Sequence, residues 1–104
     1  GDIKMPQAAT LTSVGVGQCC CHHDPTCIDI TAIVISGSPD IFINGLPAAR
    51  MGDLMQGTCG HFGTIITGAL DTFQNGIPAA RLGDITQGCV LVTLVSGSLD
   101  TLIA

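Results

Sequence analysis

A ten-residue segment that occurs twice is the strongest constraint on how this chain folds. Residues 44–53 read Asn-Gly-Leu-Pro-Ala-Ala-Arg-Met-Gly-Asp, and residues 75–84 read Asn-Gly-Ile-Pro-Ala-Ala-Arg-Leu-Gly-Asp. The offset of 75 − 44 = 31 residues lies in the range where a fixed period indicates a repeat architecture. One repeat of this size cannot bury its own apolar face, so we expect the copies to pack against one another.

The similarity extends around this segment to a third, partial copy, in which Val95-Ser-Gly matches Ile35-Ser-Gly and Ile66-Thr-Gly. We predict a single domain over residues 1–104, with repeat cores at about residues 30–56, 61–87 and 90–104. Residues 1–29 are interpreted as a degenerate first motif, which begins at Ala8 and Ala9, followed by a Cys/His-rich loop. Three copies favour an arrangement around a pseudo-threefold axis.

Composition favours β-structure. The 104 residues are 46% hydrophobic and only 11% charged, and they include 14 glycines, which is typical of short strands and tight turns. We expect strands at about residues 30–35, 41–43, 64–67, 71–74 and 90–95. Asn44-Gly45 and Asn75-Gly76 are strong signals for two-residue hairpin turns. The predicted fold class is therefore all-β, built from three β-hairpin repeats.

The charge balance excludes some partners. The net charge is −5, and Lys4, Arg50 and Arg81 are the only lysine and arginine residues, so the basic footprint of a nucleic-acid-binding protein is absent. The same lack of basic residues argues against binding to an anionic membrane surface. No apolar run is long enough to span a bilayer, and no signal-peptide pattern is present. We therefore expect synthesis in the cytoplasm.

Cysteine and histidine gather in three loops, at about residues 17–29, 57–63 and 88–90. In a cytoplasmic product this favours metal ligation over a disulfide framework, and the thiolate and imidazole set suits zinc in a closed, structural site. The second loop offers Cys59 and His61, and the third offers Cys89. The first loop leaves six candidates open: Cys19, Cys20, Cys21, His22, His23 and Cys27.

Asp53 and Asp84 could suggest a carboxylate pair, but each follows a glycine at a turn, where aspartate bonds nearby backbone amides. Arg50 and Arg81 are expected to pair with these aspartates or to cap strand ends. Because the chain has no nucleophile with a suitable base partner and no phosphate-binding loop, we predict a protein that is not an enzyme.

The two Pro-Ala-Ala-Arg tetrapeptides, each within Asn-Gly-x-Pro-Ala-Ala-Arg-x-Gly-Asp, resemble those of the PAAR-repeat family. The resemblance covers residues 30–104 well and residues 1–29 loosely. It implies a small cone whose tip is held by one zinc or iron ion, with zinc favoured here. By matching loops, the ligands would be His22, Cys59, His61 and Cys89.

The resemblance also implies a role. Such proteins cap the trimeric β-helical spike of type VI secretion systems and contractile phage tails, and the spike is driven through a target cell envelope. The expected partner is that spike, one copy of this chain per trimer, with no nucleic acid and no small-molecule substrate. The expected location is the bacterial cytoplasm, then the tip of a secretion spike or of a virion tail. The alternatives are a free-standing Cys/His metal-binding module and a thiol redox protein or metalloenzyme.

Overall fold

Short strands linked by turns make up the described part of the chain, which covers residues 7–21, 27–69 and 72–97 of a computed structural model. These residues contain no helix, so the prediction of an all-β fold is confirmed. Accordingly, no described segment is a helix of the length and apolarity that crossing a membrane requires. The strands are β1 Val14–Cys19, β2 Ile28–Val34, β3 Phe42–Ile43, β4 Leu46–Pro47, β5 Leu54–Gly57, β6 Phe62–Ile65, β7 Phe73–Gln74, β8 Ile77–Pro78, β9 Thr86–Gly88 and β10 Val90–Leu94.

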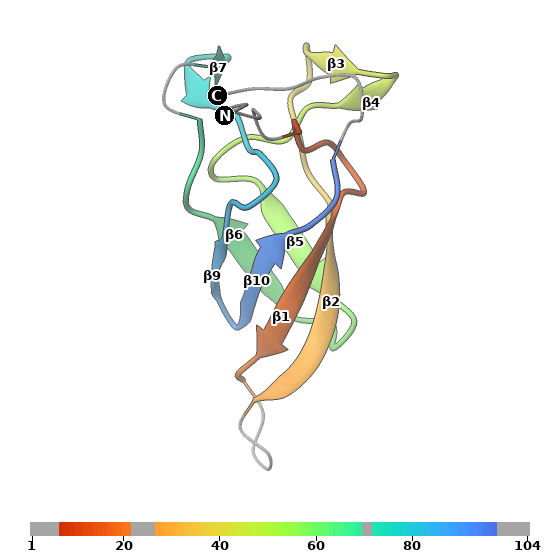
Figure 1. Ribbon diagram of the computed structural model, residues 1–104, viewed down its shortest axis with the longest axis vertical. Helices are drawn as coiled ribbons and strands as arrows, with labels where there is room; N and C mark the ends of the chain where they lie inside the picture. Colours follow the sequence, from red (N-terminus) through yellow and green to blue (C-terminus); the bar gives the residue numbers. More distant parts are fainter. Residues whose placement is uncertain (1–6, 22–26, 70–71, 98–104) are drawn as a thin grey trace, which may run out of the picture.

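Six of these strands form one antiparallel sheet in the order β10-β1-β2-β5-β6-β9. The two edge strands approach each other at a bridge between Ile85 and Thr93, so the sheet nearly closes into a barrel. Figure 1 shows it tapering towards the end of β1 and the start of β2. We predicted a cone of three β-hairpin repeats, which the described strands do not confirm: six of them form one continuous sheet, while β3–β4 and β7–β8 pair separately.

Two small hairpins, β3–β4 and β7–β8, stand at the opposite end of the molecule (Figure 1). Each turns at the predicted Asn-Gly pair, with positive φ at both positions: 53° and 80° at Asn44 and Gly45, 55° and 77° at Asn75 and Gly76. Positive φ at both central residues is the requirement of a type I′ turn, which matches the twist of the paired strands. The two hairpin turns are confirmed.

The interior of the sheet is filled by alternate residues, as the period of a β-strand requires. In β2 the even-numbered positions from Ile30 to Val34 are buried and the odd-numbered positions are exposed. The largest fully buried side chains include Met55, Ile65 and Leu94. The core thus lies inside the nearly closed sheet.

Three alanines belong to the hydrophobic core, and each has no exposed surface. The N–H of Ala9 donates to the carbonyl of Ala80, that of Ala80 to Ala49, and that of Ala49 to Ala9, each at 3.0 Å. The three bonds form a closed cycle between the two Pro-Ala-Ala-Arg segments and the segment around Ala9. Large side chains could not approach one another this closely, which explains the paired alanines in the motif.

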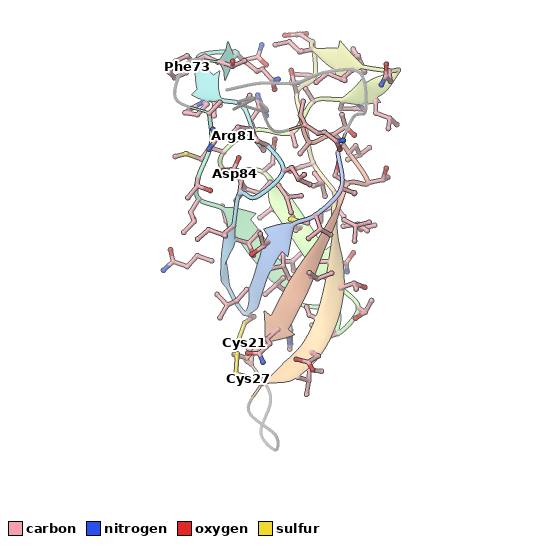
Figure 2. The ribbon with its side chains drawn as sticks, in the orientation of Figure 1. Cys21, Cys27, Phe73, Arg81 and Asp84 are labelled. Carbon is pink, nitrogen blue, oxygen red and sulfur yellow. A yellow bond between two sulfur atoms is a disulfide. The ribbon has the colours of Figure 1, made fainter. Side chains whose placement is uncertain are left out.

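The aspartate that closes each motif fastens its turn. The N–H of Arg50 donates to Oδ2 of Asp53 at 2.6 Å, and the N–H of Arg81 donates to Oδ2 of Asp84 at the same distance. The two guanidinium groups lie 3.4 and 3.3 Å from these carboxylates. Both the turn role of the aspartates and their pairing with arginine are confirmed (Asp84 and Arg81 are labelled in Figure 2).

The N-terminal segment repeats this turn with different chemistry. The N–H of Thr10 donates to Oγ of Ser13 at 2.9 Å, three residues on, as Arg50 does to Asp53. A hydroxyl therefore accepts the bond that a carboxylate accepts elsewhere, and no guanidinium is paired with it.

Candidate metal centre

Three metal-ligating side chains meet at the end of the sheet opposite the hairpins, which we call the narrow end. It comprises the end of β1, the start of β2, the β5–β6 turn and the connection from β9 to β10. Cys19 is the last residue of β1, and Cys59 and His61 belong to the turn. The Sγ atoms of the two cysteines and a ring nitrogen of His61 all lie within 4.8 Å of one another.

The β5–β6 turn presents two of these ligands because of its backbone. Gly60 has φ of 89°, a conformation that side chains rarely adopt, and its N–H donates to the carbonyl of Gly57 at 2.9 Å. The N–H of Gly57 donates in return to the carbonyl of His61 at 2.9 Å. This tight turn holds Cys59 and His61 two residues apart beside the end of β1.

Cys19 is fully buried, whereas Cys59 and His61 are half-buried. Burial raises the pKa of the Cys19 thiol above its ordinary value of 9.0, and a hydrogen bond with Cys59 raises it further. The Cys19 Sγ also lies 3.1 Å from Nδ1 of His61. An ion that enters must therefore displace the thiol proton.

The group fits a soft, tetrahedral cation. Zinc binds thiolate sulfur at about 2.3 Å and imidazole nitrogen at about 2.0 Å, so neighbouring ligand atoms in a tetrahedral site are about 3.6 Å apart. Atoms already within 4.8 Å of one another reach that spacing by small side-chain rotations. Two sulfurs and one nitrogen supply three of four positions, and these residue types could hold a metal ion.

The structure brings some of the predicted ligands together and separates others. Cys59 and His61 are brought together as expected. Cys89 is not in the group, because its sulfur is bonded to that of Cys21. His22 and His23 lie outside the described residues, so their part in a site stays a prediction.

Cys19 takes the place that the sequence left open in the first loop. The signal that identifies it is the alternation of β1, in which Gly15, Gly17 and Cys19 fall on one face of the strand, with Gly15 and Cys19 buried. We did not predict a strand over residues 14–19, so this inward position was not recognised.

Four of the six cysteines form disulfides, contrary to our expectation that metal ligation would take precedence. Cys20 is bonded to Cys27 and Cys21 to Cys89. The first bond closes the loop between β1 and β2, and the second joins the end of β1 to the β9–β10 connection. Sulfur atoms therefore gather at the narrow end, where Figure 2 labels Cys21 and Cys27.

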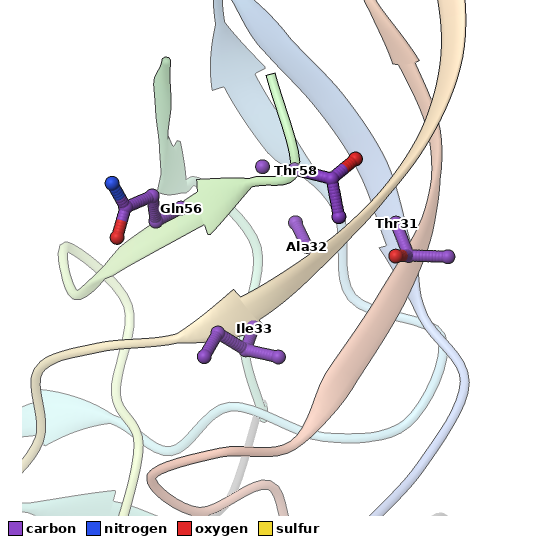
Figure 3. Close-up of a pocket in the computed structure, with 6 residues that line it drawn as sticks. Thr31, Ala32, Ile33, Gln56 and Thr58 are labelled. Carbon is purple, nitrogen blue, oxygen red and sulfur yellow. The ribbon is translucent and has the colours of Figure 1, made fainter. Parts of the chain in front are cut away.

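A pocket on the sheet offers no comparable chemistry. It lies between β2 and β5 and is lined by Thr31, Ala32, Ile33, Gln56, Gly57 and Thr58 (Figure 3). None of these side chains titrates near neutral pH or ligates a soft metal. The candidate metal centre is therefore the stronger site among the described residues.

No protein-family model matches this chain, and a search of curated proteins returns no match. What the protein does is therefore inferred from its residues and their geometry.

Proposed function

We propose that this chain is a non-enzymatic, metal-stabilised tip that caps a trimeric β-helical spike of a contractile injection machine. The observation that carries the proposal is the Cys19–Cys59–His61 group, which ties the end of β1 to the β5–β6 turn at the narrow end, away from the hairpins. In this role the narrow end is the leading point, and the metal holds it. The spike belongs to a contractile phage tail or to a type VI secretion system, and it pierces a target cell envelope.

Repetition around a centre supports a threefold cone. Besides the cycle of alanines, three glycines run close to three alanine carbonyls in the same way. A Cβ added to Gly37, Gly68 or Gly97 would lie 2.9, 3.0 and 2.7 Å from the carbonyl oxygens of Ala48, Ala79 and Ala8 respectively. Equivalent backbone contacts at three places suit a body that matches the symmetry of a trimer.

The hairpin end supports docking on a partner. Phe42 and Phe73, which are 73 − 42 = 31 residues apart, expose 58% and 59% of their surface. Large exposed aromatic side chains at equivalent positions favour an interface with a partner, because such area is costly to leave in water. The matching segment of the third copy, residues 101–103, lies outside the described residues. We assign this end to the blunt face of the spike, one chain per trimer.

In this proposal the metal is a structural ion that holds the narrow end together. Cys19, Cys59 and His61 are its described ligands, His22 remains the predicted fourth, and zinc is favoured over iron because two thiolates are present. Since a closed four-ligand site has no open position for a substrate, its role is stability.

Metal analysis and binding test this function together. The purified full chain should hold about one zinc ion per molecule. Mixed with a trimeric β-helical spike, it should bind one copy per trimer, and Phe42→Asp with Phe73→Asp should abolish binding without loss of the metal. A chain that binds no metal, or that binds the spike equally well without both aromatic side chains, would contradict the proposal.

A second function is favoured by one contact, the 3.1 Å approach of Cys19 Sγ to His61 Nδ1, which is also the arrangement of a reactive thiol beside a base. A thiol redox protein would be alkylated rapidly in its metal-loaded form, whereas a structural site would be protected. A free-standing metal-binding module would retain the metal and bind no spike.

A further inference from the structure

Two thiols approach each other at the narrow end although 59 − 19 = 40 residues separate them in sequence. The described residues include all six cysteines, and Cys19 and Cys59 are the two that remain free. Their Sγ atoms lie within 4.8 Å of each other. Bonded sulfurs are about 2.05 Å apart, so the two side chains must turn towards each other before a bond can form.

The surroundings leave room for that rotation. Gly57 lies beside the pair, and a Cβ at this position would be 3.2 Å from the Cys59 sulfur. Because glycine has no such atom, the Cys59 side chain is not blocked from this side. Cys19 is at the end of its strand, where the backbone passes from the sheet into a loop.

The cysteines next to Cys19 are oxidised in this structure. Cys20 and Cys21 directly follow Cys19, and both are in disulfides. An oxidant that reaches these two residues also meets the neighbouring thiols of Cys19 and Cys59, and a ligand that holds both as thiolates protects them from it. Metal coordination is such a ligand.

We propose that Cys19 and Cys59 form a third disulfide when no metal ion holds them, so that a metal ion and a covalent bond are alternatives for the same two sulfurs. The claim that a metal ion holds the two sulfurs rests on the proposed function, whereas the claim that they can form a disulfide does not. With either occupant, the end of β1 remains fastened to the β5–β6 turn.

The reaction needs a disulfide oxidant of low molecular weight, such as oxidised glutathione. Cys59, which is half-buried, attacks the oxidant first and forms a mixed disulfide, releasing one thiol of the oxidant. The buried Cys19 then attacks the Cys59 sulfur and expels the second. Two protein thiols and one oxidant disulfide thus become one protein disulfide and two small thiols, which carry the two protons.

Thiol mapping of the full chain tests the proposal. Zinc is removed with a chelator, oxidised glutathione is added, and remaining thiols are trapped by alkylation before intact-mass and peptide analysis. The metal-free chain should lose two hydrogens and yield a Cys19–Cys59 peptide pair, with the Cys20–Cys27 and Cys21–Cys89 pairs intact. With free zinc 100-fold above Kd, about one chain in 100 is metal-free, so thiol loss should slow about 100-fold.

Two variants sharpen the result. His61→Ala removes a metal ligand but keeps both sulfurs, so it should form the bond even when zinc is present. Thr58→Ala, in the same turn but outside the group, should behave as the unaltered chain does.

Free thiols, two glutathione adducts or bonds to other cysteines in the metal-free chain would overturn the proposal. Equal oxidation with zinc bound would overturn it too. A chain that binds no zinc yet forms the bond would refute the metal staple and leave the disulfide standing.

Discussion

The Sγ atom of Cys19 lies 3.1 Å from Nδ1 of His61, although 42 residues separate the two in the chain. This contact joins the first long strand to the turn between β5 and β6, so anything that binds both side chains ties together distant parts of the sheet. The stability of the narrow end is therefore expected to depend on what occupies this group.

Metal removal should lower the free energy of unfolding. Free zinc at 1,000-fold above its Kd stabilises a folded protein by about 4 kcal/mol, if it does not bind the unfolded chain. Loss of a group that only hydrogen-bonds to a metal ligand weakens metal binding by up to about 100-fold. His61→Ala removes a ligand itself, so it should weaken zinc binding by at least that factor. Thermal unfolding with and without chelator checks both values, and Thr58→Ala serves as the control. Equal unfolding temperatures in every sample would contradict this expectation.

Zinc affinity should rise with pH. Burial and the hydrogen bond with Cys59 raise the pKa of Cys19 above 9.0, so its thiol is protonated at neutral pH and zinc must displace the proton. For each proton displaced, affinity changes up to about tenfold per pH unit below the pKa. Competition with a chelator between pH 6 and 8 should show this slope, and Cys19→Ser should reduce it by one proton. A slope that Cys19→Ser leaves unchanged would mean that Cys19 is not a ligand.

Asp53 should matter more to stability than an exposed aspartate. Its carboxylate accepts bonds from the Arg50 N–H at 2.6 Å and from the Ser36 hydroxyl at 3.1 Å. Asp53→Ala leaves these donors without their acceptor and should cost about 1–3 kcal/mol. Asp53→Asn keeps an oxygen acceptor and should cost less, while Asp40→Ala, at an exposed site, should stay within about 0.5 kcal/mol. Urea unfolding midpoints measure the loss of stability in the three variants. Equal losses for Asp53→Ala and Asp40→Ala would refute the prediction.

Two glycines should respond differently to the same substitution. A Cβ at Gly17 would overlap the carbonyl oxygen of Leu91 in the paired strand β10, so Gly17→Ala should cost at least about 3 kcal/mol. Gly45 has φ of 80° and open space around it, so Gly45→Ala costs only its backbone strain, about 1–2 kcal/mol. Unfolding free energies of both variants test this. A smaller loss at Gly17 than at Gly45 would show that β1 does not pack closely on β10.

The local features of the fold could be predicted because each follows from one or two residue types. Asn44-Gly45 determines a turn, and Asp53 caps its own motif, so both are visible in a short window of sequence. Strand β1 was not predicted because its inward positions 15 and 17 are glycines, so the sequence shows no alternation of inward apolar and outward polar side chains. Those glycines are required by contacts with Val92 and Leu91, which lie far along the chain.

The candidate site was only half predicted for the same reason. Cys59 and His61 share one turn, so their proximity follows from sequence spacing. That Cys19 joins the group and Cys89 does not depends on which strands pair across the sheet and which cysteines bond to each other. Neither is encoded in a repeat of 31 residues, because the six cysteines do not follow that period.

The cycle of hydrogen bonds through Ala9, Ala49 and Ala80 limits how this architecture can evolve. An open array of repeats can gain or lose a unit at either end, since each unit bonds only to its neighbours. Here the segments that contain Ala9, Ala49 and Ala80 bond to one another in a closed cycle, and deletion of any one would leave a donor and an acceptor unmatched in a fully buried place. A change in the length of a surface loop breaks none of these three bonds, so it should be tolerated more easily than loss of one of the three segments.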